Sequence, residues 1–231
     1  MVPNLEQKSP EEILKWTLER FGAKVALASS FQCEESVLID MLHKIAGKAF
    51  RIYTLDTGRL NEETYEVMER VREKYCIAIE SQFPEREAVE KLEREKGLFS
   101  FRESIENRKE CCHIRKVVSL NRVLSGLDAW ITGLRAEQSV TRSGISKIEA
   151  DSPRKGITKI NPLIDWDSKQ VWDYIKKNGV PYNKLHDRGY QSIGCEPCTR
   201  AVKPGESIRS GRWWWENPDQ KECGLHTPKK P

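Results

Sequence analysis

The stretch Val25-Ala-Leu-Ala-Ser-Ser-Phe-Gln-Cys-Glu-Glu-Ser36 joins a short apolar run to a polar loop, and residues 37–45 continue with apolar side chains at helical spacing. This order predicts a buried strand, a polar loop and an amphipathic helix. The pattern then repeats, with a strand at residues 50–55, the loop Asp56-Thr-Gly-Arg59 and a helix that Asn61 can cap. Two such units in succession indicate parallel βαβ packing.

The sequence on either side extends this pattern. We expect a helix at residues 10–21, because Ser9 can cap its first turn and Gly22 can end it. Further strands are expected at residues 76–79 and 129–132. The fold class predicted from this alternation is α/β, an open, mostly parallel twisted sheet with helices on both faces.

Length and composition limit the classes of protein that fit. The 231 residues suffice for one sizeable domain, which we place at residues 1–200, followed by a mobile C-terminal tail at residues 201–231. The formal net charge of +4 comes from dispersed Lys and Arg residues, which suits a small anionic substrate better than a nucleic acid. No apolar run has the length of a membrane span and the first residues lack the apolar core of a signal peptide, so we expect a cytoplasmic protein without a membrane partner.

Three loops that follow predicted strands carry residues suited to anions. Ser29 and Ser30 lie between a strand and a helix N-terminus, where backbone N–H groups and hydroxyls can face a phosphate. The Asp56–Arg59 loop and Gly133-Leu-Arg135 each place a glycine close to an arginine, which can clamp phosphate or sulfate oxygens. Each loop alone could be an ordinary polar turn, but three of them at neighbouring strand ends favour an anion site.

The cysteines form the most specific pattern in the chain. Cys111 and Cys112 are adjacent, just before a helix expected at His113–Leu124, and Cys195 and Cys198 span a Cys-Glu-Pro-Cys turn. In a reducing compartment such thiols indicate a metal site rather than disulfides. Because adjacent cysteines suit a tetrahedral zinc ribbon poorly, we expect an iron–sulfur cluster, with structural zinc as the alternative and four buried thiols as a third reading.

Three further cysteines and one lysine complete this inventory. Cys223 stands apart near the C-terminus in Lys-Glu-Cys-Gly-Leu-His, and this single thiol outside the two pairs suggests a nucleophile. Cys33 and Cys76 are interpreted as packing residues. Lys116 follows Cys112 by four residues, so on a helix its ammonium lies on the same face as that thiol. It could contact both a metal site and a substrate.

These residues together resemble the assimilatory adenylyl-sulfate (APS) reductases of the iron–sulfur type, within the family of 3′-phosphoadenylyl-sulfate (PAPS) and APS reductases. The resembling segments run nearly end to end and are Ser29-Ser-Phe31 with Glu34-Glu35, Leu55-Asp-Thr-Gly-Arg-Leu60, Cys111-Cys112-x-x-Arg115-Lys116, Gly133-Leu-Arg135, Asn161-Pro-Leu163, Ile193-Gly-Cys-Glu-Pro-Cys-Thr-Arg200, Gly211-Arg-Trp-Trp-Trp-Glu216 and Lys221-Glu-Cys-Gly-Leu-His226. One departure is the nucleotide loop, which has Gln32 and Cys33 where the family usually has small residues or glycine.

The resemblance implies a fold like that of the adenine nucleotide alpha hydrolases and a thioredoxin-dependent reduction of APS to sulfite and AMP, in sulfate assimilation and cysteine biosynthesis. Cys223 would attack the sulfur of APS and form an S-sulfocysteine, which a thioredoxin or glutaredoxin-like dithiol would then resolve. It further implies one 4Fe-4S cluster on Cys111, Cys112, Cys195 and Cys198, and a homo-oligomer.

The resemblance also implies roles for individual residues. His226 would assist the Cys223 thiolate and Lys116 would act at the reacting centre. The substrate contacts would be Ser29, Ser30, Phe31, Glu34, Leu55, Asp56, Thr57, Gly58, Arg59, Lys116, Gly133, Arg135, Arg142, Arg209 and Arg212.

Four alternatives remain open from sequence. The two nearest are a PAPS reductase and an enzyme that accepts both nucleotides. An ATP-dependent tRNA sulfurtransferase shares the strand-loop-helix site, but residues 29–36 lack the glycines that its pyrophosphate loop requires. A zinc-stabilised binding module would explain the four cysteines and leave Cys223 without a role.

Overall fold

The computed structural model describes residues 5–138, 144–154 and 156–217, which form an open α/β sheet. The strand order is β3-β2-β1-β4-β6-β5, and neighbouring strands are parallel except for β5, which runs antiparallel to β6 at one edge. The strands are β1 Val25–Ala28, β2 Ile52–Leu55, β3 Glu80–Gln82, β4 Ala129–Ile131, β5 Ile148–Ala150 and β6 Thr158–Ile160. The predicted fold class is confirmed.

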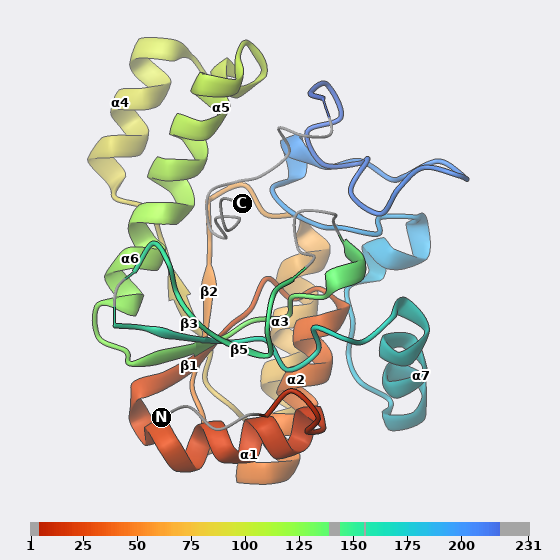
Figure 1. Cartoon of the computed structure of the whole chain (residues 1–231). Coiled ribbons are helices and arrows are strands. Elements are labelled where there is room, and N and C mark those ends of the chain that lie inside the picture. The colour runs from red at the N-terminus through yellow and green to blue at the C-terminus, as the bar shows by residue number, and fades with distance from the viewer. Residues whose placement is uncertain (1–4, 139–143, 155, 218–231) are drawn as a thin grey trace.

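Helices cover both faces of this sheet (Figure 1). Their bounds are α1 Pro10–Phe21, α2 Cys33–Ala46, α3 Glu62–Tyr75, α4 Arg86–Lys96, α5 Ile105–Cys112, α6 Val118–Leu124 and α7 Ser168–Asn178. In Figure 1 α2, α3 and α7 lie to the right of the strands, and α4, α5 and α6 lie to the left. No helix among the described residues is both long and apolar enough to pass through a bilayer.

The predicted first helix is confirmed with its caps. Ser9 accepts a hydrogen bond from the Glu12 backbone N–H, and the Glu12 side chain accepts one in return from the Ser9 backbone, so the first turn has a complete capping box. Gly22 ends the helix at positive φ. The buried stripe contains Ile13, Leu14 and Thr17, which pack α1 against the sheet layer.

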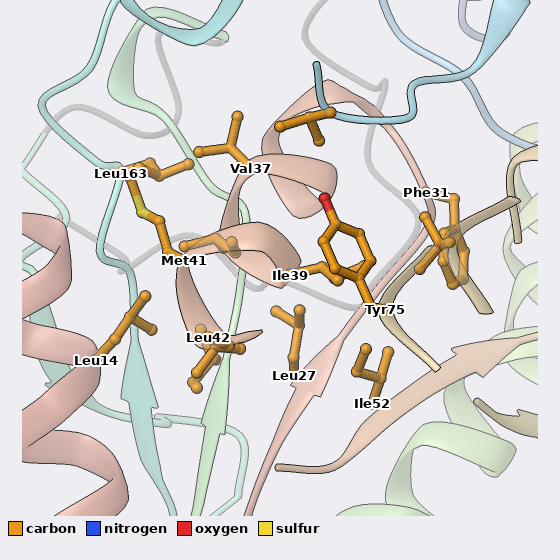
Figure 2. Close-up of a cluster of buried hydrophobic side chains, with 14 of the residues drawn as sticks. Leu14, Leu27, Phe31, Val37, Ile39, Met41, Leu42, Ile52, Tyr75 and Leu163 are labelled. Carbon is orange, nitrogen blue, oxygen red and sulfur yellow. The ribbon is translucent and has the colours of Figure 1, made fainter. Parts of the chain in front are cut away.

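The larger core lies between the sheet and the layer of α1, α2, α3 and α7. Leu27 of β1 and Ile52 of β2 are paired across the two strands, and both are buried against the α2 side chains (Figure 2). Figure 2 also shows Val37, Ile39, Met41 and Leu42 of α2, Leu14 of α1 and Tyr75 of α3 in this cluster. The first ten residues of α2, Cys33 to Leu42, are buried, which fixes its N-terminus beside the carboxyl ends of the strands.

A smaller core lies on the opposite face, where Tyr53 and Trp130 of the sheet pack against Leu120 and Leu124 of α6. Chain order reverses between β1 and β4, since β2 lies on one side of β1 and β4 on the other. Open α/β sheets bind ligands at such a switch point, outside the carboxyl ends of the strands.

The predicted position of the third strand is wrong. The third strand is Glu80–Gln82 and not 76–79, because α3 continues to Tyr75 and Cys76 then adopts a left-handed conformation with φ 50°. This turn delays pairing with β2 until Glu80. Cys76 is also exposed, so its interpretation as a packing residue is wrong, whereas Cys33 is buried as expected.

The helix expected at His113–Leu124 is the second half of a longer helical run. Cys111 and Cys112 form the last turn of α5 instead of preceding a helix, and a π-helical turn, His113–Val117, connects them to α6. Such turns accommodate an extra residue in a helix and occur often at functional sites. Helices α4, α5 and α7 and strands β5 and β6 were not predicted from the sequence.

The segment after residue 200 packs against the domain as far as it is described. Thr199 pairs with Arg212 in an antiparallel bridge, and Trp213 is 1% exposed. The described part of the expected tail, residues 201–217, therefore belongs to the same compact body as the sheet. Residues 218–231 lie outside the described part of the chain.

Candidate functional site

A cavity of about 160 Å³ opens at the switch point between β1 and β4. It is formed by the loops after β1, β2 and β4, the π-turn and the segment around residues 192–212. Of the residues expected to contact substrate, the structure places Ser29, Ser30, Leu55, Lys116, Gly133, Arg209 and Arg212 in its lining. Three of these are cations, which suits an anionic ligand.

The loop after β1 is held in a tight shape by its own side chains. Phe31 has φ 56°, in the left-handed region, and its ring is buried in the core beneath the loop. The Ser29 hydroxyl accepts a hydrogen bond from the Phe31 N–H at 3.2 Å, and Glu35 accepts one from the Gln32 N–H at 3.1 Å. Phe31 thus shapes the loop from below, and it is not among the cavity residues.

Gln32, the departure from the family's loop pattern, connects two walls of the cavity. Its side-chain amide donates to the Ser30 hydroxyl at 2.9 Å, and its carbonyl oxygen accepts from the Ile193 N–H at 2.7 Å. The Gln32 side chain therefore joins the loop after β1 to the segment that carries Cys195.

Gly133 permits a close approach at the opposite wall. A Cβ there would lie 2.5 Å from the Glu35 carboxylate, so only glycine leaves room for this side chain beside the cavity. Burial and the neighbouring Glu34 carboxylate raise the pKa of Glu35 to about 7. Glu35 was not predicted as a site residue, and only its position next to Glu34 pointed to it.

Glu34 and Arg135 lie behind the loop rather than in the cavity. They form a buried ion pair at 2.8 Å, and Arg135 also pairs with Glu137 and donates to the Ser168 hydroxyl at 3.1 Å. A guanidinium with these partners holds the loop after β4 to α2 and α7. The structure thus gives both residues a supporting position.

The loop after β2 lies beside a second cavity, which the four cysteines of the sequence pattern line. The Thr57 hydroxyl lies 3.3 Å from the Cys195 sulfur, and the Asp56 carboxylate accepts from the Gly58 N–H at 2.9 Å. Arg59 pairs with Glu93 at 3.0 Å. The resemblance implied substrate contacts for all four, but the structure turns them toward the cysteines or into the loop itself.

The second, smaller cavity is lined by all four cysteines of the sequence pattern. Cys111, Cys112, Cys195 and Cys198 are free thiols. The same cavity is lined by Phe101, Trp213 and five cations, Arg59, Arg108, Arg115, Lys116 and Arg212. Within residues 5–138, 144–154 and 156–217, no three His, Cys, Asp or Glu side chains are grouped tightly enough to hold a single metal ion. Four thiols in one cation-rich cavity do match the donor set of an iron–sulfur cluster.

The thiols differ in their electrostatic surroundings. Burial acts to raise the pKa of Cys195, but Lys116, the Thr57 hydroxyl and Arg212 outweigh it and lower the pKa below its ordinary value. Burial and the charge of Cys195 raise the pKa of Cys198 to about 12. The surrounding cations therefore favour the thiolate form at Cys195 more than at Cys198.

Lys116 and Arg212 line both cavities and form the wall between them. Lys116 hydrogen-bonds the Cys195 thiol from the π-turn. Arg212 is 6% exposed, lies 3.3 Å from the Ile193 carbonyl oxygen, and stacks on the Trp213 ring at 4.7 Å. Lys116 and Arg212 thus lie between the four thiols and the anion-suited cavity.

The remaining predicted site residues, Cys223, His226 and Arg142, lie outside the described residues. Sequence reasoning missed Glu35, Gln32 and the pair Ser192 and Ile193, which all line the larger cavity or bond to its loop. Ile193 stood within a motif, but nothing in the sequence showed which cavity it lines.

The sequence matches known proteins over most of its length. The family model for the phosphoadenosine phosphosulfate reductase domain matches residues 24–201. "Adenosine 5'-phosphosulfate reductase" from Burkholderia cepacia is 53% identical over 205 residues, covering 88% of this chain and 80% of the relative. The protein of the same name from Pseudomonas aeruginosa (strain LESB58) is 47% identical over 231 residues, covering 98% of this chain and 85% of the relative.

Solved structures agree with these matches. The phosphoadenylyl-sulfate (PAPS) reductase from Candida auris, in a phosphate complex, has a TM-score of 0.72 and 29% identity, covering 87% of this chain and 98% of the other. An FMN adenylyltransferase from Candida glabrata, with a TM-score of 0.58, 11% identity and coverage of 90% of this chain and 71% of the other, shares the fold alone. The chain belongs to the phosphoadenosine phosphosulfate reductase domain family.

Proposed function

We propose that this protein reduces adenylyl sulfate to sulfite and AMP in sulfate assimilation. The observation that carries the proposal is the shared wall of Lys116 and Arg212 between a nucleotide-type cavity and four cysteines. The names of the Burkholderia and Pseudomonas relatives support the same substrate.

The larger cavity would bind the nucleotide. Ser29, Ser30 and the backbone N–H groups at the start of α2 suit a phosphate, and Leu55 lies at the apolar side where a base can pack. Lys116, Arg209 and Arg212 would neutralise the phosphosulfate, whose charge grows on the phosphate as the bond to sulfur breaks.

The chemistry would be carried by the Cys223 thiolate. It attacks the sulfur of the bound anhydride, the bond from sulfur to the bridging oxygen breaks, and AMP leaves with that oxygen. The product is an S-sulfocysteine. A thiolate of a thioredoxin-like dithiol then attacks the Cys223 sulfur, sulfite leaves, and the dithiol ends as a disulfide, which accounts for the two electrons. His226 would assist the thiolate.

Cys111, Cys112, Cys195 and Cys198 would hold a 4Fe-4S cluster, and zinc is the alternative that metal analysis would reveal. When bound, the cluster supplies a fixed anionic charge beside Lys116. The chain's own contribution is the ring of cations around the thiols, which offsets that charge and positions Lys116 toward the nucleotide. Iron and acid-labile sulfide in the purified protein would support the cluster, and zinc without sulfide would contradict it.

Intact-protein mass spectrometry of anaerobically purified protein tests the reaction. We expect mixing with APS, without thioredoxin, to add one SO₃ group to the wild type and none to Cys223→Ser. A parallel reaction with PAPS tests specificity. A faster gain of SO₃ from PAPS would indicate that this protein is a PAPS reductase, the activity named for the Candida auris structure. No adduct with either nucleotide would contradict the proposed function.

A further inference from the structure

Arg108 is a fully buried cation of the cysteine cavity that does not line the larger, substrate-type cavity. It lies in α5, one turn before Cys112, and is 0% exposed. Its guanidinium donates two hydrogen bonds to the Glu216 carboxylate, at 2.9 Å to Oε1 and 2.8 Å to Oε2. The Glu216 side chain is itself only 4% exposed. A buried two-point pair of this kind fixes both position and orientation.

The same guanidinium reaches the cysteine cavity. Arg108 hydrogen-bonds the Cys112 thiol and lines the cavity of the four cysteines. It therefore contacts a cysteine of the proposed metal site on one side and the C-terminal segment on the other.

Trp213 completes the connection. Its ring contacts two guanidinium groups, with the guanidinium carbon of Arg108 4.6 Å and that of Arg212 4.7 Å from the ring centroid. Its backbone N–H donates to the Cys198 carbonyl oxygen at 3.1 Å. Trp213 also has φ 41°, a left-handed conformation that a bulky residue adopts only when its surroundings enforce it.

We infer that Arg108 and Glu216 are a positioning pair that anchors the C-terminal segment to the cysteine site and so sets how often Cys223 meets bound nucleotide. The inference rests on the proposed function for the role of Cys223. Neither side chain touches substrate in this arrangement, since neither lines the larger cavity.

The number of residues between the anchor and Cys223 determines how much loss of the anchor should slow the attack by Cys223. Cys223 follows Glu216 by seven residues, so an anchored Glu216 keeps it within at most about 25 Å. If the pair were lost while the Trp213 backbone stayed bonded to Cys198, ten residues would connect the nucleophile to the domain, and 25 would do so if the segment were released back to Cys198. Effective concentration falls roughly as the −3/2 power of linker length, so these two cases would slow the intramolecular attack by about twofold and about sevenfold.

The contact with Cys112 adds a second expectation. A metal group bound to Cys112 would fix the sulfur that Arg108 contacts, so we expect metal loading to hold the anchor more firmly. By linkage, metal removal should have a smaller effect on the C-terminal segment in a variant whose anchor is already loose.

The test compares Glu216→Gln, which keeps the shape and removes the charge, with Glu206→Gln as the matched control. Glu206 pairs with Arg200 at 2.8 Å within the same segment, yet neither residue lines either cavity. For Glu216→Gln we expect SO₃ transfer to Cys223 from saturating APS to slow by about twofold to sevenfold, while the Kd for AMP and the iron content stay unchanged. Glu206→Gln should match the wild type.

Hydrogen exchange of residues 211–217 in the metal-loaded and metal-depleted proteins is the second readout. We expect depletion to speed exchange in the wild type and to add little in Glu216→Gln, where exchange is already fast. Unchanged SO₃ transfer in a folded Glu216→Gln, or exchange that metal depletion does not alter in the wild type, would overturn the inference. If the wild type forms no adduct at all, the proposed function fails, and the exchange experiment still tests the anchor.

Discussion

At the scale of single residues, Lys116 has the most informative position, because its ammonium lies between the Cys195 thiol and the anion-suited cavity. We expect Lys116→Ala to slow SO₃ transfer to Cys223 by roughly 100-fold, the usual effect of removing a group that stabilises developing charge. Iron content should be unchanged. Lys109→Ala is the control, because Lys109 is exposed on α5 and lines neither cavity. An unchanged rate in Lys116→Ala would remove Lys116 from the reaction.

Gly194 leaves room for Arg212, the second residue of the wall between the two cavities. A Cβ at this position would overlap the Arg212 guanidinium, which is the flexible end of a side chain and can move aside. Gly194→Ala should therefore cost little stability but displace Arg212, and we expect nucleotide binding to weaken by roughly 10-fold or more, as for a lost charge-assisted hydrogen bond. Isothermal titration with AMP measures it. Gly126→Ala, where the nearest atom is 3.7 Å from the new Cβ, should bind like the wild type.

Glu35 makes stability depend on pH. Burial and the Glu34 carboxylate raise its pKa from 4.5 to about 7 in the folded protein. Between pH 4.5 and about pH 7 the folded protein therefore keeps a proton on Glu35 that the unfolded chain has lost. The free energy of unfolding contributed by this group therefore falls as pH rises from about 4.5 to 7. Urea unfolding of wild type and Glu35→Gln at pH 5 and pH 8 should show the variant gaining up to about 3 kcal/mol relative to the wild type. Parallel pH dependence in the two proteins would contradict this assignment.

At the scale of secondary structure, the π-turn His113–Val117 determines which way Lys116 and Arg115 point. A π-turn holds one more residue than the α-helical turn it replaces, so deleting one residue should restore a continuous helix and turn the side chains of this segment by about 100°. His113 is exposed and suits the deletion. We expect the deletion variant to remain folded by circular dichroism while losing SO₃ transfer.

The control for this deletion is His113→Ala, which removes the same side chain and leaves the number of residues unchanged. It should keep the π-turn and transfer SO₃ at the wild-type rate. Equal activity in both variants would mean that the turn does not position Lys116.

At the scale of the whole molecule, the cysteine cavity joins two distant parts of the chain, the last turn of α5 and the Cys-Glu-Pro-Cys turn. A bound metal group cross-links them and stabilises the folded state only. Cys198→Ser should lose iron and lower the midpoint of thermal unfolding by several degrees, the size expected for about 1–2 kcal/mol in a domain of this length. Cys76→Ser changes an exposed cysteine, so this variant should keep both its iron and the wild-type midpoint of unfolding. Full iron content in Cys198→Ser would contradict its role as a ligand.

Local patterns in the sequence predicted much of the fold. The capping residues of α1 and the apolar runs of β1, β2 and β4 act through neighbours in the chain, so their structure follows from the residues themselves. The third strand was misplaced because a left-handed Cys76 cannot be recognised from local propensity. Asn61 does occupy the N-cap of α3, yet its side chain donates to the Gly194 carbonyl oxygen at 3.2 Å instead of capping the helix.

The sequence by itself determined the strand-loop-helix order, the chemistry available to the site and the two cysteine pairs, because residue type and spacing encode these directly. Only the tertiary structure decided which groups meet. It brought both pairs into one cavity, withdrew Arg135 into an ion pair with Glu34, and placed Lys116 and Arg212 between the cavities. The reason is physical: a buried cation takes the nearest available anion, and which anion is nearest depends on how the sheet and helices pack, not on distance along the chain.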